Sequence, residues 1–265
     1  MRIIDAHAHL NLELYPRSLE EAASQREVGA EPLIAEMDRW GVDVVCLMGG
    51  APFRWWNWQR LPHGGNEEVL AAMRSYPDRV VGYYIPDSYG EPATVRRQLR
   101  EAVEDFGFRG IKIHSWLSAH HADADLLDVV FEFAHERELP LIFHSGTIPY
   151  STPAQMFHVA KRYPGIKVIL GHGGKTDLNA DCLALAHYAD NLYIESSGQP
   201  NKVFLERFIR DHGAERVLFG TDWLSPLGSK LPARLIEIEE LDISAAERED
   251  ILGRNAARLF RLDDR

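Results

Sequence analysis

The sequence predicts a single-domain (β/α)8 TIM barrel that spans residues 1–265. Short runs rich in apolar and β-branched residues alternate with longer amphipathic segments along the whole chain, which is the pattern of βα units around a parallel sheet. Eight such units in 265 residues match the usual size of a closed barrel. An open, doubly wound sheet is less well supported, because no Gly-x-Gly-x-x-Gly motif follows the first strand.

The individual elements follow from these periodicities. Helices are indicated where apolar residues recur at three- and four-residue spacing, and residues 15–30 form an expected insertion in the first βα loop. The predicted helical segments include 93–105, 126–138, 153–163, 202–212 and 244–260. The predicted strands are Ile3–His7, Val42–Met48, Val80–Ile85, Gly110–His114, Leu141–His144, Val168–Leu170, Leu192–Glu195 and Val217–Phe219.

Composition and charge narrow the classes of function. A formal net charge of -11, from 29 basic and 40 acidic residues, argues against nucleic acid as a partner. No apolar run approaches the roughly 18 residues of a membrane span. Cys46 and Cys182 have neither the pairing nor the spacing of a disulfide framework, and the first residues lack the pattern of a secretory signal. We therefore expect a cytoplasmic protein that acts on a small molecule and binds neither nucleic acid nor membrane.

His7 and His9 lie at the end of the first predicted strand. Residues two apart on a strand project to the same side, so both imidazoles point the same way. This is the carboxyl end of the barrel, where barrel enzymes place their chemistry, and two neutral imidazoles there could chelate one cation. Because histidine pairs at this spacing also occur without a metal, the interpretation needs further ligands.

His144, His172 and Asp222 are candidates for these further ligands. They follow the fifth, sixth and eighth predicted strands at their carboxyl ends. Burying such groups costs several kcal/mol unless they are hydrogen-bonded or coordinated, so their recurrence at equivalent positions is hard to attribute to chance. Imidazoles with a carboxylate suit Zn²⁺, Mn²⁺ or Fe²⁺, whereas Ca²⁺ and Mg²⁺ prefer more oxygen ligands. We expect one ion rather than two, with zinc ahead of manganese and iron.

Lys112 and His114 form a second same-side pair, on the fourth strand. An inward lysine is costly to bury, so Lys112 is predicted either to hold a substrate carboxylate or to carry a carbamate that bridges two metal ions. The alternative is a lysine that reaches solvent past the rim of the barrel. For His114, a metal ligand, a support for a ligand and a substrate contact all stay open.

Tryptophans gather in the loops expected at the same end of the barrel. They predict an aromatic wall around a pocket, to which Arg54 or Arg60 could add a positive charge for an anionic substrate. Ordinary loop packing or a subunit interface is the alternative, so a homo-oligomer stays open. These tryptophans are Trp55, Trp56, Trp58, Trp116 and Trp223.

Six motifs carry a further signal: Asp5–His9, Gly110–His114, Phe143–His144, Gly171–Gly174, Phe219–Asp222 and Asn255–Phe260. Taken together, these motifs resemble the amidohydrolase superfamily, in particular its amidohydrolase-related branch of metal-dependent hydrolases and decarboxylases. The resemblance implies that His7, His9, His144 and Asp222 bind a catalytic metal, with His172 near the substrate as an acid, a base or an orienting group. It also implies that Asp222 accepts a proton from a metal-activated water. Asp5 is implied to orient a metal-binding side chain without contacting the metal itself.

Three functions are compatible with this resemblance. The first is hydrolysis of a small cyclic ester, amide or related carboxylated molecule, which Gly110–His114 favours, although relatives of that group often continue with proline where Ser115 stands here. The second is non-oxidative decarboxylation, similar to aminocarboxymuconate-semialdehyde decarboxylase. The third is a catalytically silent metal-binding protein.

Overall fold

The computed structural model describes residues 1–10, 29–49, 65–198, 202–223 and 231–262. It contains an eight-stranded parallel sheet whose spatial order is the chain order, β1 to β8. All eight predicted strands are present, with ends shifted by up to two residues. They are β1 (Ile4–His9), β2 (Val44–Met48), β3 (Val80–Tyr84), β4 (Gly110–Ile113), β5 (Pro140–His144), β6 (Lys167–Gly171), β7 (Leu192–Glu195) and β8 (Val217–Leu218).

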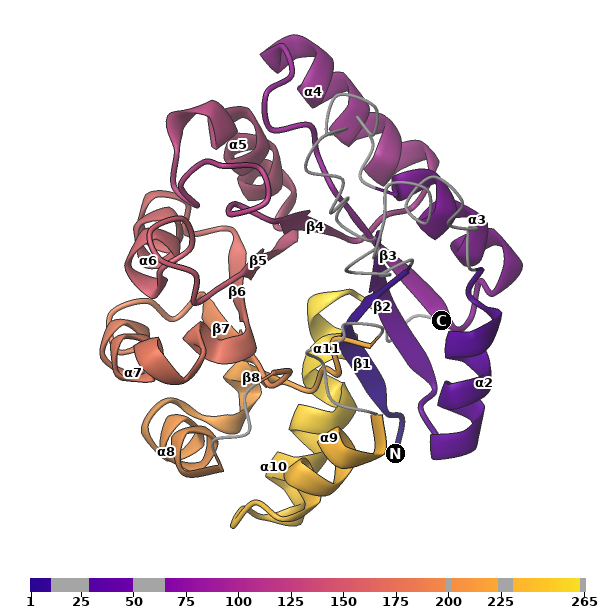
Figure 1. Ribbon diagram of the computed structural model, residues 1–265, viewed down its shortest axis with the longest axis vertical. Helices are drawn as coiled ribbons and strands as arrows, with labels where there is room; N and C mark the ends of the chain where they lie inside the picture. Colours follow the sequence, from indigo (N-terminus) through magenta and orange to yellow (C-terminus); the bar gives the residue numbers. More distant parts are fainter. Residues whose placement is uncertain (11–28, 50–64, 199–201, 224–230, 263–265) are drawn as a thin grey trace, which may run out of the picture.

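The sheet closes on itself through the residues that follow β8 (Figure 1). The amide of Ala6 donates to the carbonyl of Phe219 at 2.8 Å, and the amide of Asp222 donates to the carbonyl of His7 at 2.7 Å. A parallel bridge between Ala8 and Trp223 continues this contact. The predicted (β/α)8 TIM barrel is therefore confirmed.

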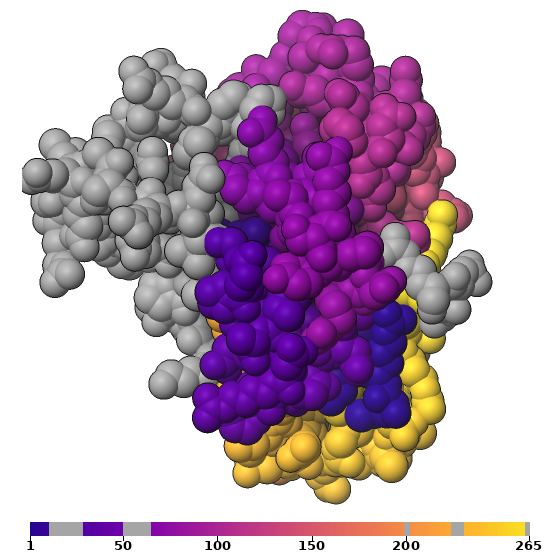
Figure 2. Space-filling model, turned by 90° about the vertical axis from the view of Figure 1, so that its right-hand side faces the viewer, coloured from indigo at the N-terminus to yellow at the C-terminus, as the bar shows by residue number. Residues whose placement is uncertain are grey.

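Helices surround the barrel and alternate with the strands. Figure 2 shows α2, α3 and α4 following one another over one side of the molecule, with the C-terminal segment below them. The predicted helices 93–105 and 244–260 each contain a π-helical turn, at Glu101–Asp105 and Asp250–Arg254. The helices are α2 (Glu31–Trp40), α3 (Asn66–Ser75), α4 (Pro92–Arg100), α5 (Asp128–Arg137), α6 (Pro153–Arg162), α7 (Asn179–Ala186), α8 (Lys202–His212), α9 (Leu231–Glu239), α10 (Ala245–Glu249) and α11 (Asn255–Leu259).

Local sequence explains where several helices begin and end. Pro92 and Pro153 occupy first-turn positions, where a missing backbone N–H costs nothing. The Glu91 carboxylate accepts from the first free amides of α4, and Thr152 forms a capping box with Gln155 before α6. Gly41 ends α2 in the left-handed region at φ 71°.

Two apolar layers follow from the alternation of side chains along the strands. Residues such as Val45, Leu47 and Phe143 face the helices, whereas Val44, Cys46 and Ile142 face the interior of the barrel. The interior layer continues into α11 and the residues after it, which close the amino end of the barrel. There the Phe260 ring meets Tyr83 edge to face at 5.3 Å. The predicted insertion at 15–30 lies almost entirely outside the described residues.

Candidate metal centre

A one-residue irregularity in β1 aims both of its histidines into the barrel. Three steps separate the paired residues Asp5 and Ala8 on β1, but only two separate their partners on β2. Before this bulge, Ile4 and Ala6 belong to the interior layer; after it, Ala8 joins the layer that faces the helices. His7 and His9, which alternate with Ala8, therefore point inward, as bulges next to active sites commonly arrange.

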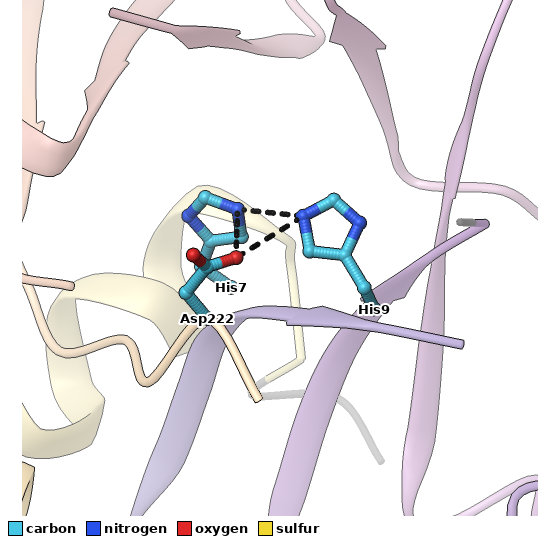
Figure 3. A group of neighbouring side chains, drawn as sticks. All are labelled: His7, His9 and Asp222. Atoms are coloured by element: carbon cyan, nitrogen blue, oxygen red, sulfur yellow. Dashed lines mark hydrogen bonds and ion pairs between the residues drawn. The ribbon is translucent and has the colours of Figure 1, made fainter. Parts of the chain in front are cut away.

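His7, His9 and Asp222 converge on a common point (Figure 3). The two Nε2 atoms of the histidines lie 3.1 Å apart. Asp222 Oδ1 lies 3.5 Å from His7 Nε2 and 3.3 Å from His9 Nε2. Asp222 reaches this position from a left-handed backbone conformation, φ 53°, just after β8. Three of the four predicted metal ligands thus form one compact group.

The protonation of this group follows from its other contacts. His9 Nδ1 lies 3.1 Å from the carbonyl of Gly49, and since a carbonyl only accepts, this nitrogen carries the proton. His7 Nδ1 lies 2.7 Å from Glu195 Oε2, which places the proton of His7 there in the same way. Burial lowers the pKa of both imidazoles well below the usual range, so both are neutral. Two nitrogen lone pairs and a carboxylate oxygen then face one another, and this donor set fits a divalent cation.

Glu195 is a site residue that the sequence analysis did not single out. It ends β7, is fully buried, and accepts from Ser197 Oγ at 2.8 Å and from the His172 amide at 3.3 Å. Burial raises its pKa to about 7. Its contact with His7 Nδ1 is the carboxylate–histidine arrangement that orients metal-binding imidazoles. The available signal was its place at the end of a strand, as for His144.

Asp5 supports the site through the backbone. Its carboxylate accepts from the His7 amide at 3.0 Å, from the Thr221 amide at 3.1 Å and from the Thr221 hydroxyl at 2.6 Å. Burial raises the pKa of Asp5 to about 7. Asp5 therefore ties β1 to the segment after β8 and sets the spacing between His7 and Asp222.

Lys112 points into the barrel, as predicted, and is 1% exposed. Its Nζ lies 3.5 Å from His7 Nε2. Burial lowers the pKa of Lys112 to about 8, against the opposing effects of Asp222 and Glu195. The lysine does not reach solvent past the rim, while the choice between a substrate contact and a carbamate stays a prediction.

The histidines at the strand ends form a continuous row. Ring centroids are 5.1 Å apart for His9 and His7, 5.0 Å for His7 and His172, 4.8 Å for His172 and His144, and 4.5 Å for His144 and His114. His172 also belongs to a second group of close donor atoms, with His7 and Glu195. His172 therefore sits in the middle of the row, beside the predicted metal position.

His144 lies further along this row. Its Nδ1 is 3.1 Å from His172 Nε2, and its Nε2 is 3.1 Å from Thr147 Oγ1 and 3.2 Å from Lys175 Nζ. It belongs to neither group of close donor atoms. The predicted metal-binding role of His144 therefore stays a prediction.

The aromatic wall is described in part. Trp116 meets the rings of His114 and His144, at centroid distances of 5.5 and 6.1 Å. His114 Nδ1 has no hydrogen-bond partner among the described residues. Trp223 is half-buried beside Asp222. The other predicted members, Trp55, Trp56, Trp58, Arg54 and Arg60, lie outside the described residues.

Comparison with known families decides where this barrel belongs. The amidohydrolase family model matches residues 4–262. The chain belongs to the amidohydrolase family. This confirms the resemblance drawn from Asp5–His9 and the later strand-end motifs, and it makes the chain an enzyme of the amidohydrolase superfamily.

Individual proteins similar to this chain share less than a quarter of its residues in the matches described here. The 2-amino-3-carboxymuconate-6-semialdehyde decarboxylase of Dictyostelium discoideum is 23% identical over 277 residues, which cover 87% of this chain and 76% of the relative. Dihydroxybenzoic acid decarboxylase from a Polaromonas species, solved with manganese and 2-nitroresorcinol, has a TM-score of 0.79 at 20% identity and covers 99% of this chain and 97% of its own. The 5-carboxyvanillate decarboxylase of Sphingomonas paucimobilis has a TM-score of 0.75 at 19% identity. The match covers 98% of this chain and 99% of the decarboxylase.

The structural likenesses establish the barrel fold. None of the helices described for this chain is long and apolar enough to cross a bilayer.

Proposed function

We propose that this protein is a metal-dependent, non-oxidative decarboxylase of a small unsaturated or aromatic carboxylic acid. The observation that carries the proposal is the convergence of two imidazole lone pairs and a carboxylate at His7, His9 and Asp222. The three relatives named above are decarboxylases, which favours release of CO₂ over the hydrolysis expected first from the sequence. Ser115, at the position where the hydrolase group often has proline, agrees with this choice.

His7, His9 and Asp222 would hold one divalent ion. Manganese joins zinc as a candidate because the Polaromonas decarboxylase was solved with it. When bound, such an ion supplies a Lewis acid that attracts the oxygen atoms of an anionic substrate. The neutral state of both histidines and the proton on each Nδ1 prepare the chain for this role.

The remaining residues would handle the proton. In decarboxylation the bond between the ring or alkene carbon and the carboxylate breaks, its electron pair stays on that carbon, and a proton takes the place of CO₂. Asp222 and His172 are the proposed proton carriers, since both lie beside the predicted metal position. Lys112 adds a positive charge that stabilises an anionic substrate and the charge left on carbon.

The proposal is tested by measuring CO₂ release. Purified protein loaded with Mn²⁺ or Zn²⁺ is supplied with a panel of aromatic and unsaturated carboxylic acids, and CO₂ is compared with loss of the acid. We expect equal amounts of both. His9→Ala should lower the rate at least about 100-fold. The reason is that losing even a residue that only hydrogen-bonds to a metal ligand lowers metal affinity or activity about 10- to 100-fold. His187→Ala, which changes an exposed histidine, is the control.

Other outcomes identify other functions. Hydrolysis of lactones or amides without CO₂ would overturn the proposal in favour of the hydrolase. Metal binding without turnover of any acid, lactone or amide would leave the silent metal-binding protein.

A further inference from the structure

Lys175 occupies a backbone conformation that is costly for any residue with a side chain. Its φ and ψ are 55° and 172°, in a region that only glycine adopts readily. It ends a run of four residues with positive φ that begins at His172. Holding a non-glycine residue there costs free energy, and such outliers cluster where a side chain has to be aimed.

The surroundings enforce this conformation. The Gly174 amide donates to Ser145 Oγ at 2.8 Å, and the carbonyl of Gly173 accepts from Asn179 Nδ2 at 3.1 Å. The Lys175 amide itself donates to the carbonyl of His172 at 2.9 Å. Gly146 leaves room for the stem of Lys175, since a Cβ on Gly146 would lie 2.8 Å from Lys175 Cγ. The loop therefore fixes the direction in which Lys175 leaves the backbone.

That direction leads to the row of imidazoles. Lys175 Nζ lies 3.2 Å from His144 Nε2, and no carboxylate of the described residues lies within 4.0 Å of it. Its side chain is half-buried. Burial is the main cause that lowers the pKa of His144 and His172, and Lys112 and Lys175 both add to it, so the two ammonium groups act on the same pair of rings. They do so from different places, because Lys112 Nζ contacts His7 instead.

The charged groups described around the row of imidazoles leave a positive excess once a divalent ion is bound. Among the described residues, the carboxylates of the site are Asp5, Glu195 and Asp222, and the ammonium groups are Lys112 and Lys175. With one divalent ion, the site keeps a net charge of about +1 even when all three carboxylates are ionised. Such a site selects anions, within a protein whose formal net charge is -11.

We infer that Lys175 binds a second carboxylate of the substrate, so that the enzyme acts on dicarboxylic acids, of which one carboxylate leaves as CO₂ and the other is retained. This inference rests on the proposed decarboxylation. In this arrangement Lys112, next to His7, binds the substrate carboxylate that lies at the metal and leaves as CO₂. Lys175, next to His144, binds the substrate carboxylate that is retained.

Binding of inert ligands tests this inference separately from turnover. Benzene-1,3-dicarboxylate is compared with its monomethyl ester, and glutarate with its monomethyl ester, by calorimetry on Mn²⁺-loaded protein freed of excess metal. Each pair differs by one negative charge. We expect wild-type protein to bind at least one diacid about 10-fold or more tightly than its ester, the contribution of a hydrogen bond between charged groups.

Variants then assign the preference to Lys175. In Lys175→Met the ratio of the two affinities should fall to within about twofold of unity, Lys175→Arg should keep most of it, and Lys167→Met, at the opposite end of β6, should keep all of it. A lysine that only supports His144 would change both affinities together and leave the ratio unchanged. An unchanged ratio in Lys175→Met, or no preference in wild-type protein, would overturn the inference.

Stability gives a second measurement. Lys175→Gly should raise the Tm by a few degrees, because glycine relieves the backbone cost, while it removes the preference for the diacid. A lower Tm would contradict the argument from strain. If the preference depends on Lys175 but no acid releases CO₂, the binding inference stands and the proposed reaction is wrong.

Discussion

The two ends of this barrel are built from the same strands but bury opposite kinds of side chain, apolar at one end and polar or charged at the other. At the amino end, Ile4, Val44 and Ile142 pack with Phe260 of the closing segment in an apolar layer. At the carboxyl end, the strands and the loops after them bury histidines, carboxylates and a lysine against one another. Apolar burial stabilises the fold, whereas burial of groups such as Glu195 costs free energy that hydrogen bonds only partly offset. The groups that stabilise the fold and the groups of the site therefore lie at opposite ends of the barrel.

The largest expected effect on stability is at the amino end. Phe260→Ala should lower the free energy of unfolding by about 3–5 kcal/mol, because it leaves a cavity beside Tyr83. Activity per folded molecule should stay within about twofold of wild type. Urea unfolding and a rate normalised to folded protein measure both. Phe106→Ala, at a ring that is 37% exposed, is the matched control. A loss of activity without a loss of stability would break the division between the two ends.

The next largest effect is at the carboxyl end, where a substitution should weaken metal binding without lowering stability. Glu195→Gln should weaken Mn²⁺ binding about 10- to 100-fold, because an amide no longer fixes the proton on His7 Nδ1. The metal-free variant should be at least as stable as wild type, since a buried carboxylate is removed. Competition with a chromogenic chelator gives the affinity, and Glu132→Gln on the surface of α5 is the control. Unchanged affinity would mean that Glu195 does not orient His7.

The smallest effect of a single substitution concerns the pH dependence of stability. Burial lowers the pKa of the five histidines in the row, so below pH about 6.5 the unfolded chain binds protons that the folded chain does not. The unfolding free energy of metal-free protein should therefore fall as the pH falls from 6.5 to 5, by up to about 1.4 kcal/mol per pH unit for each imidazole. Asp5 and Glu195, whose pKa burial raises to about 7, act in the opposite direction between about pH 4 and 7, but they are fewer.

Substitutions can show whether this change of the unfolding free energy with pH comes from the carboxyl end of the barrel. Urea unfolding in a chelator at pH 5 and 6.5 should give a smaller difference for His114→Phe than for wild type. His187→Ala removes an exposed histidine that forms no ion pair within the described residues, and should leave the difference unchanged. A stability that rises towards pH 5 would show that the two carboxylates outweigh the histidines.

Most of the fold could be predicted because strands buried on both faces form continuous apolar runs. Leu192–Glu195 was predicted with the ends that the structure gives it. His7, His9 and Asp222 could be predicted as one group because polar side chains buried at strand ends are costly unless they bind a partner or an ion. Glu195 was overlooked as the last residue of an apolar strand. Lys175 carries no periodic signal, since its role depends on a loop conformation.

The bulge in β1 was also beyond sequence reasoning. Residues Ile4 to His9 alternate regularly between apolar and polar side chains, which predicts one uninterrupted strand. The irregularity appears only when β1 is aligned with β2. The pairing of the two strands shifts by one residue between Asp5–Val45 and Ala8–Leu47. A register is a property of two strands, so the sequence of one of them does not contain it.

The bulge has a consequence for how such a site can be gained or lost. If all six residues of β1 stayed in step with β2, the inward-facing set would continue from Ile4 and Ala6 to Ala8, and His7 and His9 would point at the surrounding helices. The same six side chains can therefore either fill a barrel or present two imidazoles, according to a shift of one residue in register against β2. Such a shift reorients both imidazoles at once and replaces neither of them.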